Sequence, residues 1–176
     1  MKTYEFKNIL FNYINEKFSM EYPMLKGKIY RERLRINQPK YPYLVLKSGE
    51  RTRINKRFEN YLEGNSEFTR VQYRLPITFT LYDLKSNPED AEQFCDEVID
   101  YIESFFADNL STHIDLRNLG IVVNELMISG VRDMSTYAKT DQEFVREIDI
   151  VFEFEELKEF VPERGQDLSV DITSLD

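Results

Sequence analysis

A strict alternation near the C-terminal end constrains the fold more than any other feature of the chain. Four apolar residues alternate there with three acidic ones: Ile148, Ile150, Phe152 and Phe154 against Glu147, Asp149 and Glu153. Because successive side chains of a strand point to opposite faces, residues 144–154 predict a strand with one buried and one solvated face. Such strands are typical of antiparallel sheets that are covered on one side only.

A second long strand is predicted over residues 67–83. Its apolar side carries Tyr73, Leu75, Ile77, Phe79 and Leu81, and its polar side carries Arg74, Thr78 and Thr80. Pro76 lacks a backbone N–H, which predicts an edge or a bulge at that point. Shorter strands are predicted at residues 28–36, 43–47 and 120–128. Ser48-Gly49 is interpreted as a turn, with residues 51–58 returning as the second arm of a basic hairpin, and Gly64-Asn65-Ser66 is a further turn signal.

Two amphipathic helices are predicted, over residues 3–19 and 88–107, from apolar residues spaced three and four apart. The second begins with a proline and two acids, which suit the first turn of a helix. We therefore expect an α+β fold: a mainly antiparallel sheet with the N-terminal helix and the second amphipathic helix (about 88–107) packed on one face, a long basic β-hairpin and an acidic C-terminal tail. Residues 1–155 are expected to form a single domain, and residues 156–176 an acidic extension that is flexible or bound to a partner.

The composition narrows the class of protein. The chain has 176 residues and a formal net charge of −9, which argues against tight nucleic-acid binding over the whole surface. One cysteine excludes an internal disulfide and suits a reducing compartment. No run approaches the roughly 20 apolar residues that span a bilayer. We expect a soluble protein made in the cytoplasm, with no membrane partner.

No constellation of residues for catalysis or cofactor binding stands out. Cys95 and His113 are the only residues of their types, so they cannot form a structural zinc site, and Cys95 fits a small buried thiol. There is no glycine-rich phosphate loop. The densest acidic patch, Glu153, Glu155, Glu156 and Glu159, is interpreted as a solvated strand face leading into the acidic tail rather than as a metal site. We therefore predict no catalytic residue, no cofactor and no metal.

Charge is distributed unevenly along the chain. Residues 28–57 contain ten basic residues opposed only by Glu32 and Glu50, whereas residues 153–176 contain eight acids against Lys158 and Arg164. Either both regions are ordinary solvated surfaces, or they are complementary surfaces that fit head-to-tail contacts between copies. In the second interpretation, the candidate subunit or tube interface consists of Arg51, Arg53, Lys56, Arg57, Glu153, Glu155, Glu156 and Glu159.

The order of segments resembles that of bacteriophage neck and tail-terminator (tail-completion) proteins. In that family an N-terminal helix precedes a proline-marked entry into a strand, here NQPKYPYLVLKSG. A long strand ending in an aromatic residue follows, here YRLPITFTLYDL. A polar break then leads into an amphipathic helix, here NPEDAEQFCDEVIDYIESFF, and closing strands. The resemblance covers roughly residues 3–155, and its weight comes from the order of the motifs.

The resemblance implies a structural virion protein without enzymatic activity. Members of the family assemble as a ring, usually a hexamer, at the head-proximal end of the tail tube. The ring stops tube growth and joins the tail to the head connector, while DNA passes through the lumen without sequence-specific binding. The implied partners are other copies of the chain, the tail-tube protein, the head connector and, in contractile tails, the sheath. Two alternatives stay open: a monomeric or dimeric adaptor or assembly factor, and, less favoured, a carboxylate-dependent hydrolase.

Overall fold

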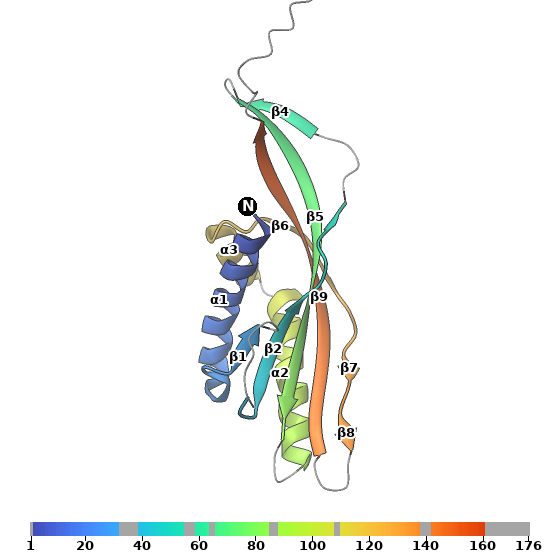
Figure 1. The fold of residues 1–176 in the computed structure, drawn as a ribbon. Helices are drawn as coiled ribbons and strands as arrows, with labels where there is room; N and C mark the ends of the chain where they lie inside the picture. The colour runs from blue at the N-terminus through green and yellow to red at the C-terminus, as the bar shows by residue number, and fades with distance from the viewer. Residues whose placement is uncertain are drawn as a thin grey trace, which may run out of the picture.

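The computed structural model describes residues 2–31, 39–54, 59–63, 66–84, 88–107, 110–137 and 142–160. A layer of three helices covers one face of a nine-stranded, mostly antiparallel sheet, and Figure 1 shows the other face without helices. This confirms the predicted α+β class. The elements in order are α1 (Thr3–Glu21), the 3-10 helix η1 (Pro23–Leu25), β1 (Ile29–Arg31), β2 (Tyr43–Ser48), β3 (Thr52–Arg53), β4 (Glu59–Glu63), β5 (Ser66–Asp83), α2 (Pro88–Ala107), α3 (Leu110–Asn118), β6 (Val123–Ile128), β7 (Arg132–Asp133), β8 (Thr136–Tyr137) and β9 (Gln142–Phe160).

Two long strands, β5 and β9, form the centre of the sheet. They pair antiparallel without a register shift from Glu67 opposite Phe160 to Asp83 opposite Phe144. Both predicted strands are therefore confirmed, and β9 runs further than the alternation indicated. Because β9 continues unbroken to Phe160, no structural boundary lies at residue 155.

Short strands lie end to end along each side of the central pair. β2, β3 and β4 all pair with β5, and β6, β7 and β8 all pair with β9. The predicted turn at Ser48-Gly49 is therefore wrong, because β2 and β3 run in the same direction along one partner. Among the described strands from β2 to β5, the direction reverses from Glu63 to Ser66, at the second turn signal, where β4 and β5 form the hairpin.

The break between β2 and β3 arises from Pro76 on β5. The Gly49 N–H donates to the Pro76 carbonyl oxygen at 2.9 Å. Pro76 has no backbone N–H, so it cannot donate the second hydrogen bond of this pair. The register shifts by one residue across the break, from Ser48 opposite Ile77 to Thr52 opposite Arg74. A Cβ on Gly49 would lie 2.7 Å from Pro76 Cγ, so only glycine fits here. Pro76 itself stays in register with Val151 of β9, so the interruption that its missing N–H causes lies between β2 and β3.

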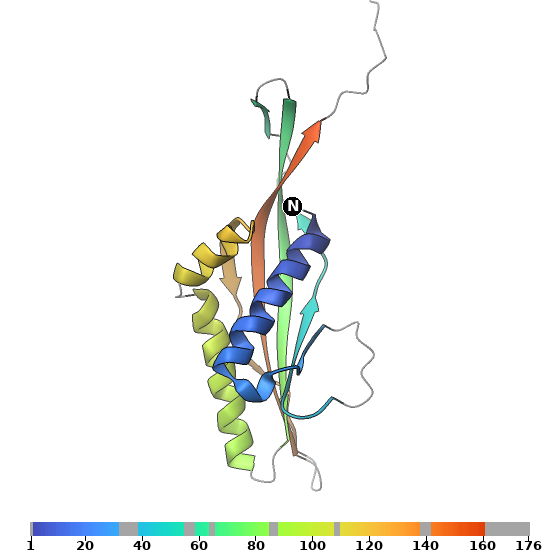
Figure 2. The same cartoon turned by 90° about the vertical axis from the view of Figure 1, so that its left-hand side faces the viewer.

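The core lies between the helices and the sheet and is rich in aromatic side chains. The Phe6 ring on α1 stacks on Phe154 of β9, with centroids 4.4 Å apart, and meets Phe152 edge-on at 5.7 Å. The α2 face toward the sheet is buried: Ala91, Phe94, Cys95, Val98, Ile99, Ile102, Phe105 and Phe106. Figure 2 shows α1 lying diagonally across the sheet beside α2. Helix α3 was not predicted, and it buries only Thr112 and Leu116 among its described side chains.

The ends of β5 and β9 extend well beyond the helices. There β4, β5 and β9 form a three-stranded arm, with rows such as Tyr61, Phe68 and Glu159 in register. In Figures 1 and 2 the arm projects past the start of α1, and no helix of the described chain lies against it. The fold thus consists of a compact body and a projecting strand arm.

Candidate assembly surfaces

Arg53 and Glu153, one from each of the two predicted charged groups, lie on opposite faces of the sheet. Arg53 on β3 is opposite Tyr73, whose side chain belongs to the face under the helices. Glu153 on β9 is opposite Arg74, whose exposed side chain belongs to the face without helices. Since side chains alternate along a strand, the structure keeps Arg53 and Glu153 apart within one copy.

Arg51 is held against the body of the protein rather than projecting from it. Its guanidinium carbon lies 3.9 Å from the centroid of the Tyr73 ring, and its Nη1 donates to Thr3 Oγ1 at the start of α1. Arg53 lies two residues on, exposed, in β3. Lys56 and Arg57 lie outside the residues that the structure describes.

The predicted acidic residues on β9 make contacts within the sheet. Glu153 Oε1 accepts a hydrogen bond from Arg74 Nε at 2.8 Å. Glu155 Oε1 accepts from Gln72 Nε2 at 3.3 Å and from Asn124 Nδ2 at 3.1 Å. Glu156 and Glu159 continue β9 opposite Val71 and Phe68.

The open face of the sheet carries a ladder of polar pairs next to these acids. Arg132 Nη2 lies 2.6 Å from Glu147 Oε1 and 2.8 Å from Asp149 Oδ2, and Thr78 Oγ1 donates to Asp149 Oδ1 at 2.5 Å. Burial raises the pKa of Asp149, but the contacts with Thr78 and Arg132 outweigh it and leave that pKa below its ordinary value. Sequence reasoning placed these polar residues on the solvated face but did not single out Arg132.

A tyrosine cluster occupies one end of the sheet. The Tyr43 and Tyr82 rings stack with centroids 4.6 Å apart, and Tyr41 lies 5.3 Å from Tyr43. The Tyr41 hydroxyl donates to Glu143 Oε1 at 2.5 Å. Burial and the Glu143 carboxylate raise the pKa of Tyr43 to about 12. The hydroxyls therefore stay protonated, and this end of the sheet carries no tyrosinate charge near neutral pH.

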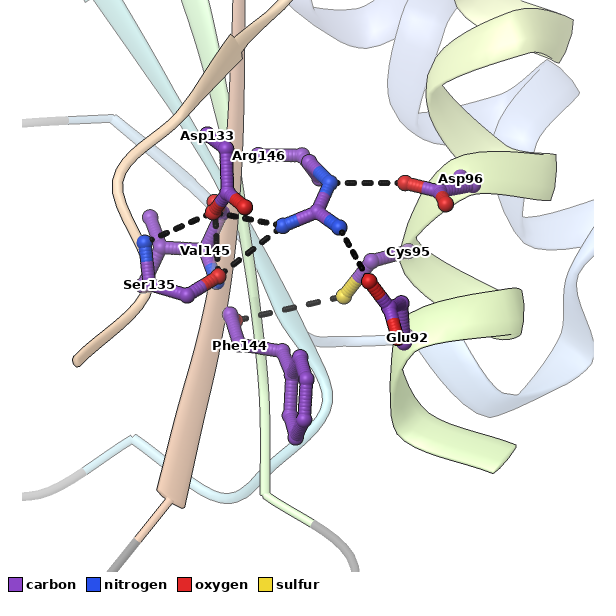
Figure 3. Close-up of polar contacts among 8 residues, drawn as sticks. All are labelled: Glu92, Cys95, Asp96, Asp133, Ser135, Phe144, Val145 and Arg146. Atoms are coloured by element: carbon purple, nitrogen blue, oxygen red, sulfur yellow. Dashed lines mark hydrogen bonds and ion pairs between the residues drawn. The ribbon is translucent and has the colours of Figure 1, made fainter. Parts of the chain in front are cut away.

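Arg146 was missed by the sequence analysis and organises a polar cluster in the body (Figure 3). Its side chain is only 7 % exposed, and it contacts three carboxylates: Asp96 at 2.6 Å, Asp133 at 2.7 Å and Glu92 at 3.3 Å. Ser135 Oγ accepts a further bond from Nη1 at 2.9 Å. Although burial lowers the pKa of Arg146, the carboxylates raise it above its ordinary value overall. The cluster ties α2 and the β7–β8 edge to β9.

A groove of about 480 Å³ lies between the first half of α1 and the edge of the sheet. Its lining combines apolar and polar surface, and Lys7 and Arg31 contribute positive charge. Arg31 is fixed there because its Nη1 donates to Asn8 Oδ1 at 2.6 Å and its guanidinium lies 4.3 Å from the centroid of the Phe11 ring. The lining residues are Thr3, Tyr4, Lys7, Leu10, Phe11, Arg31, Leu46, Ser48, Gly49 and Ile77.

The two single-copy residues with reactive side chains are placed apart from this groove. Cys95 is buried on α2, with its Sγ 3.9 Å from the Phe144 carbonyl oxygen. His113 Nε2 lies 3.1 Å from the Phe106 carbonyl oxygen on the neighbouring helix. Across the described residues, no three His, Cys, Asp or Glu side chains gather as metal ligands would. The helices described are all too short or too polar to cross a membrane.

Comparisons with known proteins bear on the fold. No protein-family model and no curated protein matches the chain. Twenty-eight chains of solved structures match it. One of them, described without a function, is 11 % identical, with a TM-score of 0.50, and the match covers 93 % of this chain and 99 % of that one. At this identity the likeness extends to the fold alone.

Proposed function

We propose that the chain is a structural virion protein that forms a ring at the head-proximal end of a phage tail tube. The ring would end tube growth and join the tail to the head connector, with DNA in the lumen. The observation that carries the proposal is the strand arm of β4, β5 and β9, which extends past the helices (Figure 1).

An arm of this kind is suited to contact with another protein chain. A few strands without a covering layer are marginally stable in water, and they gain stability when a partner packs on them. Since the described helices all cover the body, a neighbouring copy or the end of the tube would supply that cover. An enzyme has no evident need for such an arm, whereas a subunit that must reach its neighbour does.

The placement of charge agrees with head-to-tail contacts. Arg53 and Glu153 lie on opposite faces of one sheet, so a copy presents two unlike surfaces. Unlike surfaces that meet between copies give heterologous interfaces, which close into rings when the rotation allows. A net charge of −9 further suits a lumen that DNA passes without binding, because like charges repel. The tail tube, the head connector and, in a contractile tail, the sheath would contact the two rims of the ring.

Reversing the charge of Arg53 tests this proposal. We expect Arg53→Glu to raise the concentration needed for assembly on tail tubes by about tenfold, because it places an acid against an acidic neighbour. Arg53 is chosen because its side chain is exposed on β3. Sedimentation of the chain with its cognate tail-tube protein measures the effect.

The matched control is Arg117→Glu, an exposed arginine on α3. It makes the same change in net charge as Arg53→Glu. If the position of the charge matters, the concentration needed for assembly should stay within about twofold of that of the unaltered chain. An equal loss of assembly in both variants would show that the net charge, and not the position of Arg53, causes the effect. If neither variant loses assembly, Arg53 is not part of the interface.

A further inference from the structure

The groove beside α1 has the chemistry of a binding site for an extended acidic segment. Leu46 and Ile77 of the sheet and Leu10 of α1 form its apolar floor, and Lys7 and Arg31 add positive charge. Beside it, the β1–β2 register ends with Arg31 opposite Leu46, and Ser48 lies two residues further along β2. The groove thus follows the edge of the sheet, where a strand-like segment can lie.

The C-terminal sequence of the chain carries the complementary pattern. In QDLSVDITSLD, residues 166–176, the apolar residues Leu168, Val170 and Ile172 alternate with polar ones. Asp167 and Asp171 share the polar side of that alternation. In an extended conformation the apolar side chains point to one side and the carboxylates to the other. Such a segment can place its apolar side on the floor of the groove and its carboxylates within reach of the rim cations.

We propose that this groove binds residues 166–176 of a second copy of the chain. The inference rests on the proposed ring, which supplies the neighbouring copy, and it assigns the acidic tail to a specific partner surface. The groove would then be one half of a head-to-tail contact, with apolar burial and charge complementarity acting together.

The tail of the same copy would have to turn back to make this contact. Phe160 is opposite Glu67, and the near end of the groove is at Gly49, which binds Pro76. Because β9 runs away from Pro76 toward the tip of the arm (Figure 1), the tail would have to reverse and cross β5 to reach the groove.

A labelled peptide of residues 161–176, titrated with the full-length chain, tests the proposal without requiring a ring. We expect saturable binding by fluorescence anisotropy. Lys7→Glu in the chain should weaken it at least tenfold, because the rim then repels the peptide. The matched control is Lys26→Glu, an exposed lysine outside the groove, which should leave binding within twofold. A peptide with Val170→Asp and a scrambled peptide should not bind.

Absence of saturable binding, equal binding of the scrambled peptide, or equal effects of Lys7→Glu and Lys26→Glu would overturn the assignment. Circular dichroism of both chain variants checks that they fold. A chain that binds the peptide but never forms a ring on tubes would contradict the proposed function and leave the groove assignment standing. A ring that forms while the peptide fails to bind would contradict the groove assignment and leave the proposed function standing.

Discussion

Phe6→Ala is expected to lower the free energy of unfolding by about 3–5 kcal/mol, the range for removing a fully buried phenylalanine. The Phe6 side chain is 0 % exposed, stacks on Phe154 and meets Phe152 edge-on. It is therefore the main aromatic contact between α1 and the centre of β9. Alanine would leave a cavity between a helix and a sheet, and rigid elements of this kind close a cavity only in part.

Urea denaturation followed by circular dichroism measures this change. The matched control is Tyr4→Ala, two residues earlier on α1, where the side chain is 73 % exposed. Its effect should stay within about 0.5 kcal/mol, as for most surface substitutions. A loss below about 1 kcal/mol for Phe6→Ala would contradict the packing of α1 on β9.

Arg146→Ala is expected to lower the free energy of unfolding by about 2–3 kcal/mol. Removing one member of a buried ion pair typically costs about 3–5 kcal/mol when the remaining charge stays buried. Here the remaining carboxylates, Glu92, Asp96 and Asp133, are each about half exposed and can regain water. The cost is therefore reduced, but the hydrogen bonds to a charged group and the packing of the side chain are lost.

Arg132→Ala provides the control for Arg146→Ala. Arg132 also contacts two carboxylates, but its side chain is 44 % exposed, so its loss should cost at most about 1 kcal/mol. The same urea titration compares the two variants. Equal effects would contradict the assignment of Arg146 as the buried centre that ties α2 and β7 to β9.

Local patterns predicted the elements whose side chains alternate or recur regularly. β9 and α2 were recognisable because the buried residues of each follow one period over several turns or rows. The same reasoning failed for α3, because its buried residues Thr112 and Leu116 do not make an apolar stripe. A helix stabilised by so few contacts carries little signal in its own sequence.

Features that depend on distant residues could not be predicted. Ser48-Gly49 has the composition of a turn, but Pro76 on another strand makes it a bulge. Arg146 falls in phase with Ile148 and Ile150, which was a usable sign of burial. Its partners come from α2 and β7, however, and no local pattern links those segments.

The placement of the candidate interface residues could be predicted only in part. Uneven charge along the chain directed attention to Arg51 and Arg53, but the sequence did not indicate that Arg51 folds onto Tyr73. The opposite placement of Arg53 and Glu153 follows from the pairing register of β3, β5 and β9. Register depends on the whole sheet, so it becomes visible only in the folded chain.

The mass of the assembled protein tests the central proposal most directly. Light scattering after gel filtration, first on the chain alone and then on the chain mixed with its cognate tail-tube protein, measures it. The proposal predicts a closed, ring-sized species, either in solution or only at the ends of tubes. A monomer or dimer that does not respond to tail tubes would contradict the ring and favour an adaptor protein.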